Sequence, residues 1–216
     1  MDEFVITALD AARPKGWFDL TVEGKPPFLV DSETIYKNSL RVGGVVTESM
    51  LGKIRYESDL AWLKYKGTQI LSRRMVSERE LRRKLTEEKR PVNIREEVIT
   101  QFKNYGFLDD TKFAASFVRT QIAHGPKSKM FLKQKLREKG IQDDIALQAI
   151  EAEFGGFDEI SAVKGMAAKK YQTVKYLPPQ KAKNRVINFL RSRGFPWDII
   201  RQAIDDLIPP NQGEQS

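Results

Sequence analysis

The sequence predicts a mainly α-helical protein, built as a tandem array of three three-helix units that follows a small N-terminal β-containing segment. The first observation behind this prediction is a set of five apolar positions that recurs at offsets of 51 and then 54 residues. Two helical faces and their connection keep register twice, which indicates repeated units with an extended binding surface rather than a buried active site. The three sets are Leu81, Leu85, Ile94, Val98 and Ile99; Leu132, Leu136, Ile145, Ala149 and Ile150; and Val186, Leu190, Ile199, Ala203 and Ile204.

The second observation is that the signals for helix ends recur with the same repeat. Ser77 followed by Glu80 is a capping-box pattern at the start of a helix, and Ser128 lies 51 residues after Ser77. Gly140 and Gly194 each follow a second helix and precede an apolar residue, which is typical of a helix C-terminus. The expected starts and ends of the helices therefore recur at the same spacing as the apolar positions.

The N-terminal segment has a different pattern. A β-favouring apolar run at residues 4–9 is followed by a turn signal at residues 14–16 and by a second apolar run that ends at Val22. Residues 28–30 suit a further strand, so we expect two to four strands and then a short helix near residues 32–40. Another helix is expected from Thr47, with Gly52 as a candidate interruption.

These patterns predict five segments along the chain. Within the first unit, Pro91 separates the second helix from the third, and the third unit has a longer linker broken by Pro178 and Pro179. Gly155 and Gly156 separate the second unit from the third. The predicted boundaries are residues 1–56 for the N-terminal extension, 57–105, 106–155 and 156–208 for the three units, and 209–216 for a polar tail.

Composition narrows the classes of function. The chain has no cysteine, which excludes disulfides and thiol chemistry and favours a cytoplasmic location. It starts without a signal-peptide pattern and has no run of about 18 apolar residues, so we expect no membrane segment. The net charge is +8, with a balance of −3 over residues 1–60 and +11 over the remainder. A basic array attracts polyanions or an acidic partner, although such a charge also serves solubility.

Catalytic patterns are weak. His124 is the single histidine and is expected in a surface loop, and no glycine-rich phosphate-binding motif occurs. Carboxylate pairs at residues 109–110 and 143–144 sit at helix starts, where capping explains them without a metal; a third pair lies at 205–206. We expect no enzyme, no metal and no cofactor, and we keep a metal-dependent nuclease using Asp109 and Asp110 as a distant alternative.

The basic residues of the second helices suggest a binding face, because the repeat fixes which positions point away from the core. This face is strongest in the first two units, since Ile187 replaces a basic residue in the third. The alternative for each residue is an ordinary solvated helix surface. The candidate binding residues are Arg79, Arg82, Arg83, Lys133, Arg137 and Arg191.

A helix-turn-helix that reads DNA bases is disfavoured. In such motifs the second of the paired helices enters the major groove by its amino end. The corresponding helices begin with carboxylates, which would repel phosphates. Any contact with nucleic acid should therefore involve the backbone or a filament. The carboxylates are Glu96, Glu97, Asp143, Asp144 and Asp198.

Three groups of residues together resemble the RecX family of bacterial recombinase regulators, over about residues 57–207. The most specific group opens the second unit and combines a glycine-aromatic-leucine-Asp-Asp segment with a following Phe and Ala. The groups are Ser77, Glu80, Leu81, Lys84 and Leu85; Gly106, Phe107, Leu108, Asp109, Asp110, Phe113 and Ala114; and Leu136, Lys139, Gly140 and Ile141. The third unit departs from the family pattern at Pro196 and Trp197.

The resemblance implies a function in the control of homologous recombination, DNA repair and the SOS response. Such a protein binds the RecA recombinase filament on single-stranded DNA and restrains its strand exchange and ATP hydrolysis. It implies no catalytic residue and no cofactor, and a monomer that reaches DNA through the filament. The alternative is a stand-alone module that binds nucleic acid without sequence preference.

Overall fold

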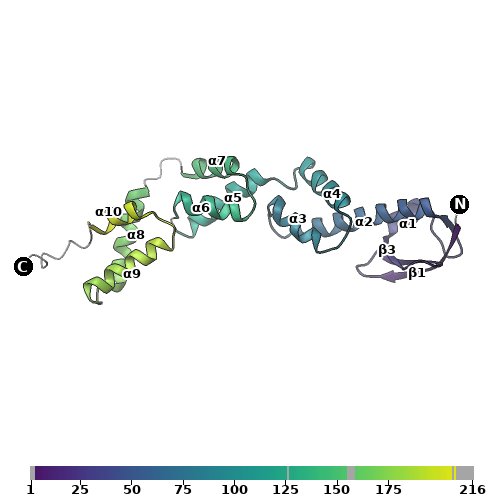
Figure 1. Ribbon diagram of the computed structural model, residues 1–216, viewed down its shortest axis with the longest axis horizontal. Helices are drawn as coiled ribbons and strands as arrows, with labels where there is room; N and C mark the ends of the chain where they lie inside the picture. The colour runs from purple at the N-terminus through teal and green to yellow at the C-terminus, as the bar shows by residue number, and fades with distance from the viewer. Residues whose placement is uncertain (1–2, 126, 155–158, 206, 208–216) are drawn as a thin grey trace, which may run out of the picture. The chain divides into compact units, whose positions relative to one another are not determined.

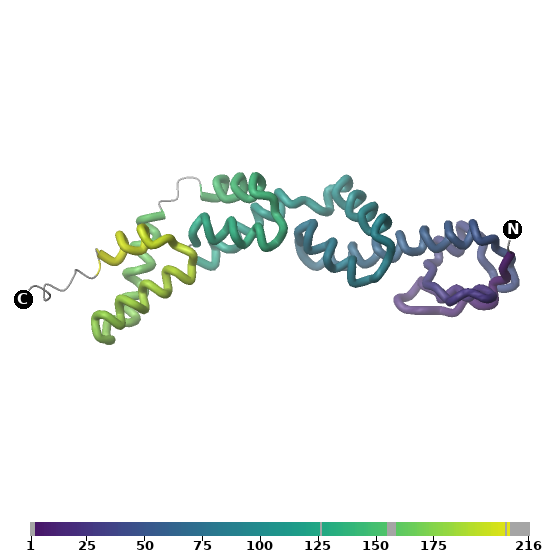
Figure 2. The backbone as a smooth tube through the Cα atoms, viewed as in Figure 1, coloured from purple at the N-terminus to yellow at the C-terminus, as the bar shows by residue number. Residues whose placement is uncertain are grey.

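The structure is a computed structural model that describes residues 3–125, 127–154, 159–205 and 207 (Figure 1). It divides into two compact bodies, residues 1–109 and residues 110–216, which are treated separately below. Pro126, the Gly155–Gly156 separator, Asp158, Asp206 and the polar tail at residues 209–216 lie outside the described residues. Figure 2 follows the backbone from the N-terminal strands into the successive helices.

Body one begins with a four-stranded antiparallel sheet in the order β3-β2-β1-β4. The expected short helix begins after Asp31, whose carboxylate accepts hydrogen bonds from the backbone amides of Glu33 and Thr34. One face of the sheet packs on the following long helix around buried Ile6, Leu20 and Ile54. The elements are β1 Glu3–Ala12, β2 Trp17–Val22, β3 Phe28–Asp31, α1 Ser32–Lys37 and β4 Val45–Thr47.

The long helix α2 (Glu48–Leu71) is continuous, so the expected interruption at Gly52 is wrong. The boundary predicted between residues 56 and 57 falls inside this helix. The reason is that Leu51 and Ile54, on either side of Gly52, both pack with the sheet, and Leu63 further along the helix packs in the core of the first repeat. Burial on both sides of Gly52 outweighs the low helical propensity of one exposed glycine.

The mainly helical fold class is confirmed, because three three-helix repeats follow the sheet along the chain. The first repeat shares the C-terminal part of α2, and each repeat has its own buried cluster. All fifteen repeated apolar positions are buried except Ile145 and Ile199, which are partly buried. The remaining helices are α3 Glu78–Thr86, α4 Val92–Asn104, α5 Asp110–Ala123, α6 Lys129–Glu138, α7 Asp143–Phe154, α8 Glu159–Val174, α9 Pro179–Arg191 and α10 Trp197–Asp205.

The predicted helix ends are also present. The hydroxyl of Ser77 accepts from the amide of Glu80 at 3.2 Å, and that of Ser128 accepts from the amide of Phe131 at 3.0 Å. Gly140 and Gly194 have φ values of +84° and +81°, which an L side chain rarely adopts. Helices α3 and α6 therefore begin, and α6 and α9 end, where the serine and glycine signals predict.

Within body two, the second and third repeats meet at Ser128. Its hydroxyl donates to the carbonyl oxygen of Gly194 at 2.5 Å, and its amide donates to the carbonyl oxygen of Arg193 at 3.3 Å. A Cβ on Gly194 would lie 2.5 Å from the Cβ of Phe131, so the close approach requires glycine. The helix start of one repeat is thereby joined to the helix stop of the next.

Two glycines of α2 offer a matched test of packing in body one. A Cβ at Gly67 would lie 2.3 Å from Cε2 of Phe102, whereas a Cβ at Gly52 meets no atom within 4 Å. We expect Gly67→Ala to lower the free energy of unfolding, because overpacking costs about 1–3 kcal/mol. Gly52→Ala should raise it by about 0.5–1 kcal/mol through helical propensity. Urea unfolding measures both, and equal stability of the two variants would contradict the packing described.

Candidate binding surfaces of the helical repeats

Arg82 of α3 is held inside the first repeat. Its guanidinium Nη2 donates to Glu78 at 2.8 Å and to Glu96 of α4 at 2.9 Å, and its Nε lies 3.1 Å from the same Glu96 carboxylate. Hydrogen bonding from Arg82 is the main cause that lowers the pKa of Glu96. A guanidinium that bridges two carboxylates links α3 to α4, so Arg82 has a structural role whether or not it also binds a partner.

The other candidates on α3 are more available. Arg83 pairs with Glu87 at 3.2 Å one turn along the helix, and both side chains are about two-thirds exposed. Such a pair contributes little to stability and is easily exchanged for another partner. Arg79 is exposed and forms no ion pair with any residue that the structure describes. Arg79 is therefore the candidate on this helix whose charge stays fully available.

In the second repeat, one carboxylate faces both candidate residues of α6. Asp143, in the first turn of α7, lies 3.1 Å from Nζ of Lys133 and 3.6 Å from Arg137. The hydrogen bond from Lys133 is the main cause that lowers the pKa of Asp143. Asp143, one of the carboxylates that argue against recognition of DNA bases by this helix, thus also partly neutralises the basic residues of α6.

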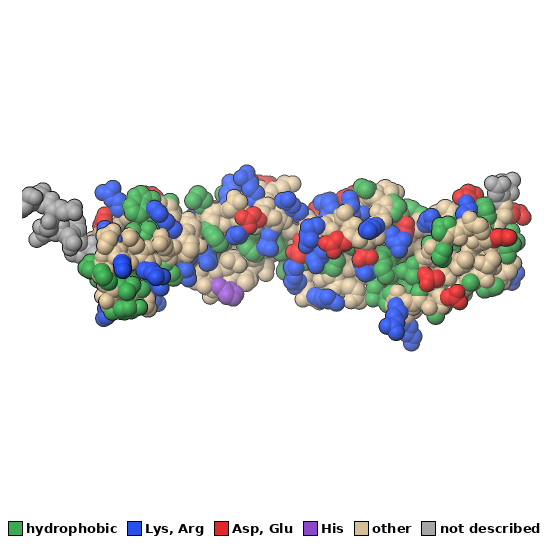
Figure 3. Space-filling view, turned by 60° about the horizontal axis from the view of Figure 1, so that its bottom comes forward, with side chains coloured by type: hydrophobic (Ala, Val, Ile, Leu, Met, Phe, Trp, Pro, Cys, Tyr) green, Lys and Arg blue, Asp and Glu red, His purple; other side chains and the backbone are tan. Residues whose placement is uncertain are grey.

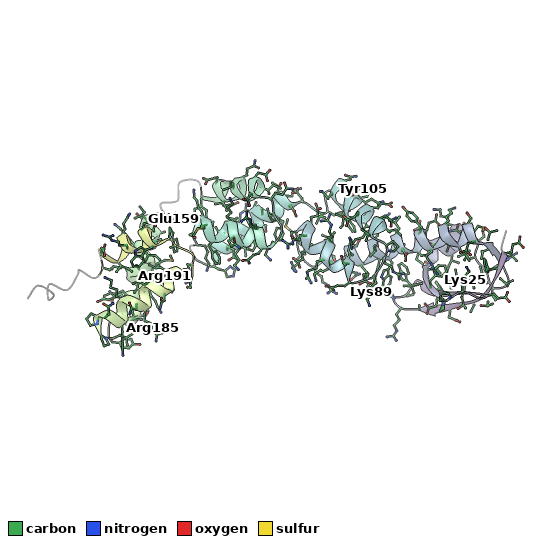
Figure 4. All side chains as sticks on the ribbon, viewed as in Figure 1. Lys25, Lys89, Tyr105, Glu159, Arg185 and Arg191 are labelled. Atoms are coloured by element: carbon green, nitrogen blue, oxygen red, sulfur yellow. The ribbon has the colours of Figure 1, made fainter. Side chains whose placement is uncertain are left out.

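The third repeat replaces this carboxylate by an aromatic ring. Arg191 and Trp197 lie 54 residues after Arg137 and Asp143, and the Arg191 guanidinium carbon is 5.3 Å from the Trp197 ring centroid. Both side chains are exposed, and Arg191 has no ion pair among the described acidic residues. Figure 4 labels Arg191 on the third repeat. A cation over an indole keeps its full charge, so the third repeat offers an un-neutralised arginine beside an exposed aromatic.

The motif at residues 106–110 combines a turn, an anchor and an exposed ring. Gly106, with φ +72°, ends α4, and the side chain of Leu108 is buried in the core of the first repeat. Phe107 is 67% exposed and lies beside Tyr105, which is 71% exposed, with 6.3 Å between the ring centroids. Asp110 is the first residue of α5 and Asp109 precedes it. The motif thus presents one aromatic ring outside the core, beside the ring of the preceding Tyr105.

Models of protein families match two segments of body two. Residues 109–150 match the second three-helix domain of RecX, and residues 158–204 match the third. The chain belongs to the RecX family. The Regulatory protein RecX of Clostridium acetobutylicum is 26% identical over 98% of this chain and 100% of its own length. That of Bacillus velezensis is 27% identical over 91% of this chain and 74% of its own length.

Solved RecX structures share the fold. The chain aligns with a crystal structure of regulatory protein RecX with a TM-score of 0.66 and 24% identity, over 94% of this chain and 99% of that one. It aligns with the crystal structure of RecX from Lactobacillus salivarius with a TM-score of 0.59 and 23% identity, over 69% and 96%. The curated relatives are named regulatory proteins.

One group of residues in this RecX chain was missed by the sequence analysis. We call it the junction cluster: Lys127 and Arg193, with the rings of Phe131 and Phe189, where the second and third repeats meet. Nζ of Lys127 is 5.2 Å from the Phe131 ring centroid, and the Arg193 guanidinium is 4.0 Å from that of Phe189. Burial and then the charge of Arg193 lower the pKa of Lys127. Two cations that disfavour one another would both gain from a bound anion.

The junction cluster escaped prediction for a physical reason. Lys127 precedes the capping residue of a helix, and Arg193 lies in the turn that ends a helix. Helical periodicity therefore does not predict where either side chain points. Their proximity comes from the contacts of Ser128 with the backbone of residues 193 and 194. The sequence predicts the capping roles of Ser128 and Gly194, but nothing in the sequence pairs these two residues with one another.

Among the described residues, no group of three or more His, Asp or Glu side chains could hold a metal ion. His124 is exposed, and its Nδ1 lies 2.7 Å from the carbonyl oxygen of Thr120 one turn earlier. None of the described helices is long and apolar enough to cross a membrane.

Arg82 and Arg79 allow the structural role to be separated from the binding role. We expect Arg82→Gln to lower the free energy of unfolding by about 1 kcal/mol, because two carboxylates lose a charged partner. Arg79→Gln should leave stability unchanged, since Arg79 has no such partner in the described structure. Urea unfolding compares the variants, and equal stabilities would show that the Arg82 bridge contributes nothing.

The same bridge predicts a dependence on pH. The pKa of Glu96 is lowered in the folded state, so its contribution to stability is present above the ordinary pKa of 4.5 and is lost as pH falls through the lowered value. The stability difference between the unmodified chain and Arg82→Gln should therefore shrink as pH is lowered from 7 to about 3. Unfolding curves across this range check it; a constant difference would contradict it.

Proposed function

We propose that this chain is a non-catalytic regulator that binds the RecA filament on single-stranded DNA and inhibits its ATPase and strand exchange. It would act in the control of homologous recombination, DNA repair and the SOS response. The observation that carries the proposal is the match of body two to RecX three-helix domains. The relatives' name, Regulatory protein RecX, supports a regulatory role.

The charges on the repeats support a polyanionic or acidic partner. Lys127, Arg193 and Arg191 of body two lack a carboxylate partner among the described residues, and all three lie close to an aromatic ring. Arginine and aromatic side chains are the residues that most often dominate protein interfaces. Because they are distributed over two repeats, several weak contacts on one scaffold can add without a deep pocket.

The stoichiometry follows from this arrangement. Each repeat is a small folded unit with its own core, so the chain can present its contacts as a monomer. Inhibition would then rise with the ratio of this chain to RecA and saturate once the filament is covered. DNA would be reached through the filament, with contacts to the backbone and not to base edges.

A second candidate is a stand-alone module that binds nucleic acid without sequence preference. The junction cluster favours it, because cations beside rings suit a phosphate backbone with exposed bases. Affinity for bare DNA that equals affinity for RecA-coated DNA, and that falls steeply with salt, would support this alternative. Stronger binding to the coated DNA supports the filament regulator.

The experiment for the proposed function uses the junction cluster. The double variant Lys127→Glu, Arg193→Glu should weaken inhibition of the DNA-dependent ATPase of RecA by about tenfold in the concentration required, because two favourable charges become repulsive. These residues are better probes than Lys133 and Arg137, since Asp143 already pairs with those two and reversal would disturb the fold.

A matched control is Lys169→Glu on α8 with Lys175→Glu in the turn after it. It changes the net charge by the same amount at two exposed residues without ion pairs in the described structure. The control should inhibit as the unmodified chain does. An equal loss of inhibition in both variants would show that the effect depends only on net charge. No inhibition by the unmodified chain at saturation would overturn the proposed function.

A further inference from the structure

A groove of about 1200 Å³ lies in body one, between the β1–β2 hairpin and the helices α2 and α3. It belongs entirely to residues 1–109, and of its lining residues only Lys84 is also among the residues that carry the family resemblance. Figure 3 shows apolar surface bordered by basic side chains where the sheet adjoins the first repeat. The groove therefore combines two kinds of surface that a polyanion with apolar groups could use.

Aromatic rings form the wall of the groove. The ring of Trp17 meets that of Trp62 edge to face, with 4.9 Å between centroids, and Tyr65 lies 5.9 Å from Trp62 with its plane tilted by 34°. Trp17 is 6% exposed, so its ring is buried and contributes to the packing of the wall. Trp62 and Tyr65 are half-buried, so parts of their rings remain open to a ligand.

The two carboxylates that line the groove are already occupied. Glu88 accepts a hydrogen bond from Nε1 of Trp62 at 2.8 Å and pairs with Lys66 at 3.1 Å. Nζ of Lys66 also lies 4.8 Å from the Trp62 ring centroid. Glu87 pairs with Arg83 outside the groove. These contacts hold Trp62 in a fixed orientation and neutralise the negative charge that would repel an anion.

Four further cations line the groove without a counter-charge. Arg13 and Lys15 project from the hairpin and Arg73 follows the end of α2; all three are exposed, while Lys84 of α3 is half-buried. None of the four forms an ion pair with a residue that the structure describes. Although residues 1–60 are acidic in sum, this edge of the segment is cationic.

We propose that this groove binds single-stranded nucleic acid, with phosphates at Arg13, Lys15, Arg73 and Lys84 and a base against Trp62 and Tyr65. Cationic tracks with partly open aromatic rings are the general solution for binding single strands without sequence preference. A duplex fits less well, because its bases are stacked inside and cannot reach the rings. An acidic peptide would use the cations but would leave the rings without a flat partner. The inference stands apart from the proposed binding to RecA.

Tryptophan fluorescence tests this groove directly. The chain has three tryptophans, so Trp197→Phe leaves only Trp17 and Trp62, both of which line the groove. In this variant, a thymidine oligonucleotide without RecA should quench the emission, because a base that stacks near an indole changes its excited state. The affinity should fall with salt, with a slope of about −0.7 for each phosphate neutralised.

Charge reversal at the hairpin identifies the site. Arg13→Glu, Lys15→Glu in the same background should weaken oligonucleotide binding by about tenfold or more and reduce the salt slope by about 1.4, since two phosphate contacts are lost. The matched control is Arg41→Glu, Lys53→Glu, which makes the same charge change at exposed residues of body one outside the groove. Circular dichroism checks that both variants fold.

Three results would overturn the proposal. One is the absence of quenching by the oligonucleotide, and another is an equal loss of affinity in the control variant. The third is equal quenching by a polyglutamate peptide of the same charge, which would assign the groove to an acidic protein segment. Inhibition of RecA is measured separately with the unmodified chain, because Trp197 lies beside Arg191 in the proposed binding surface. Loss of this inference therefore leaves the proposed function intact, and the reverse also holds.

Discussion

Burial of the same five apolar positions in each three-helix repeat is the constraint on which the rest of the structure depends. Each repeat is small and has a buried cluster of its own, and these positions on the second and third helices face that cluster. Once they do, the outward direction of every other residue on those helices is set. The capping serines and the positive-φ glycines then fix where the helices start and stop.

The repeats share this inward pattern but handle their outward charges differently. In the first, Arg82 is bridged by Glu78 and Glu96; in the second, Lys133 and Arg137 share Asp143. In the third, Trp197 takes the place of the carboxylate, and Arg191 keeps its charge. The number of basic residues in a repeat is therefore a poor guide to its capacity to bind, because neutralisation depends on the partner across the helix pair.

The sequence predicted the features that residues close together along the chain determine. Helical periodicity identified the buried positions, and the serine and glycine signals identified the helix ends, because both depend on residues within a turn or two. The sequence did not predict the features that depend on contacts between residues far apart along the chain. The continuity of α2 through Gly52 depends on packing of the residues that flank it against the distant strands. The junction cluster depends on Ser128 reaching residues 193 and 194. The groove of body one needs a hairpin, a long helix and α3 together, so no single segment carries its pattern.

We propose that body two meets the RecA filament through the junction cluster and Arg191. Hydrogen exchange of this chain, alone and bound to RecA filaments on single-stranded DNA, measures that contact. We expect slower amide exchange at residues 127–135 and 189–197 in the bound state. Unchanged exchange in both segments, with protection elsewhere or nowhere, would contradict it.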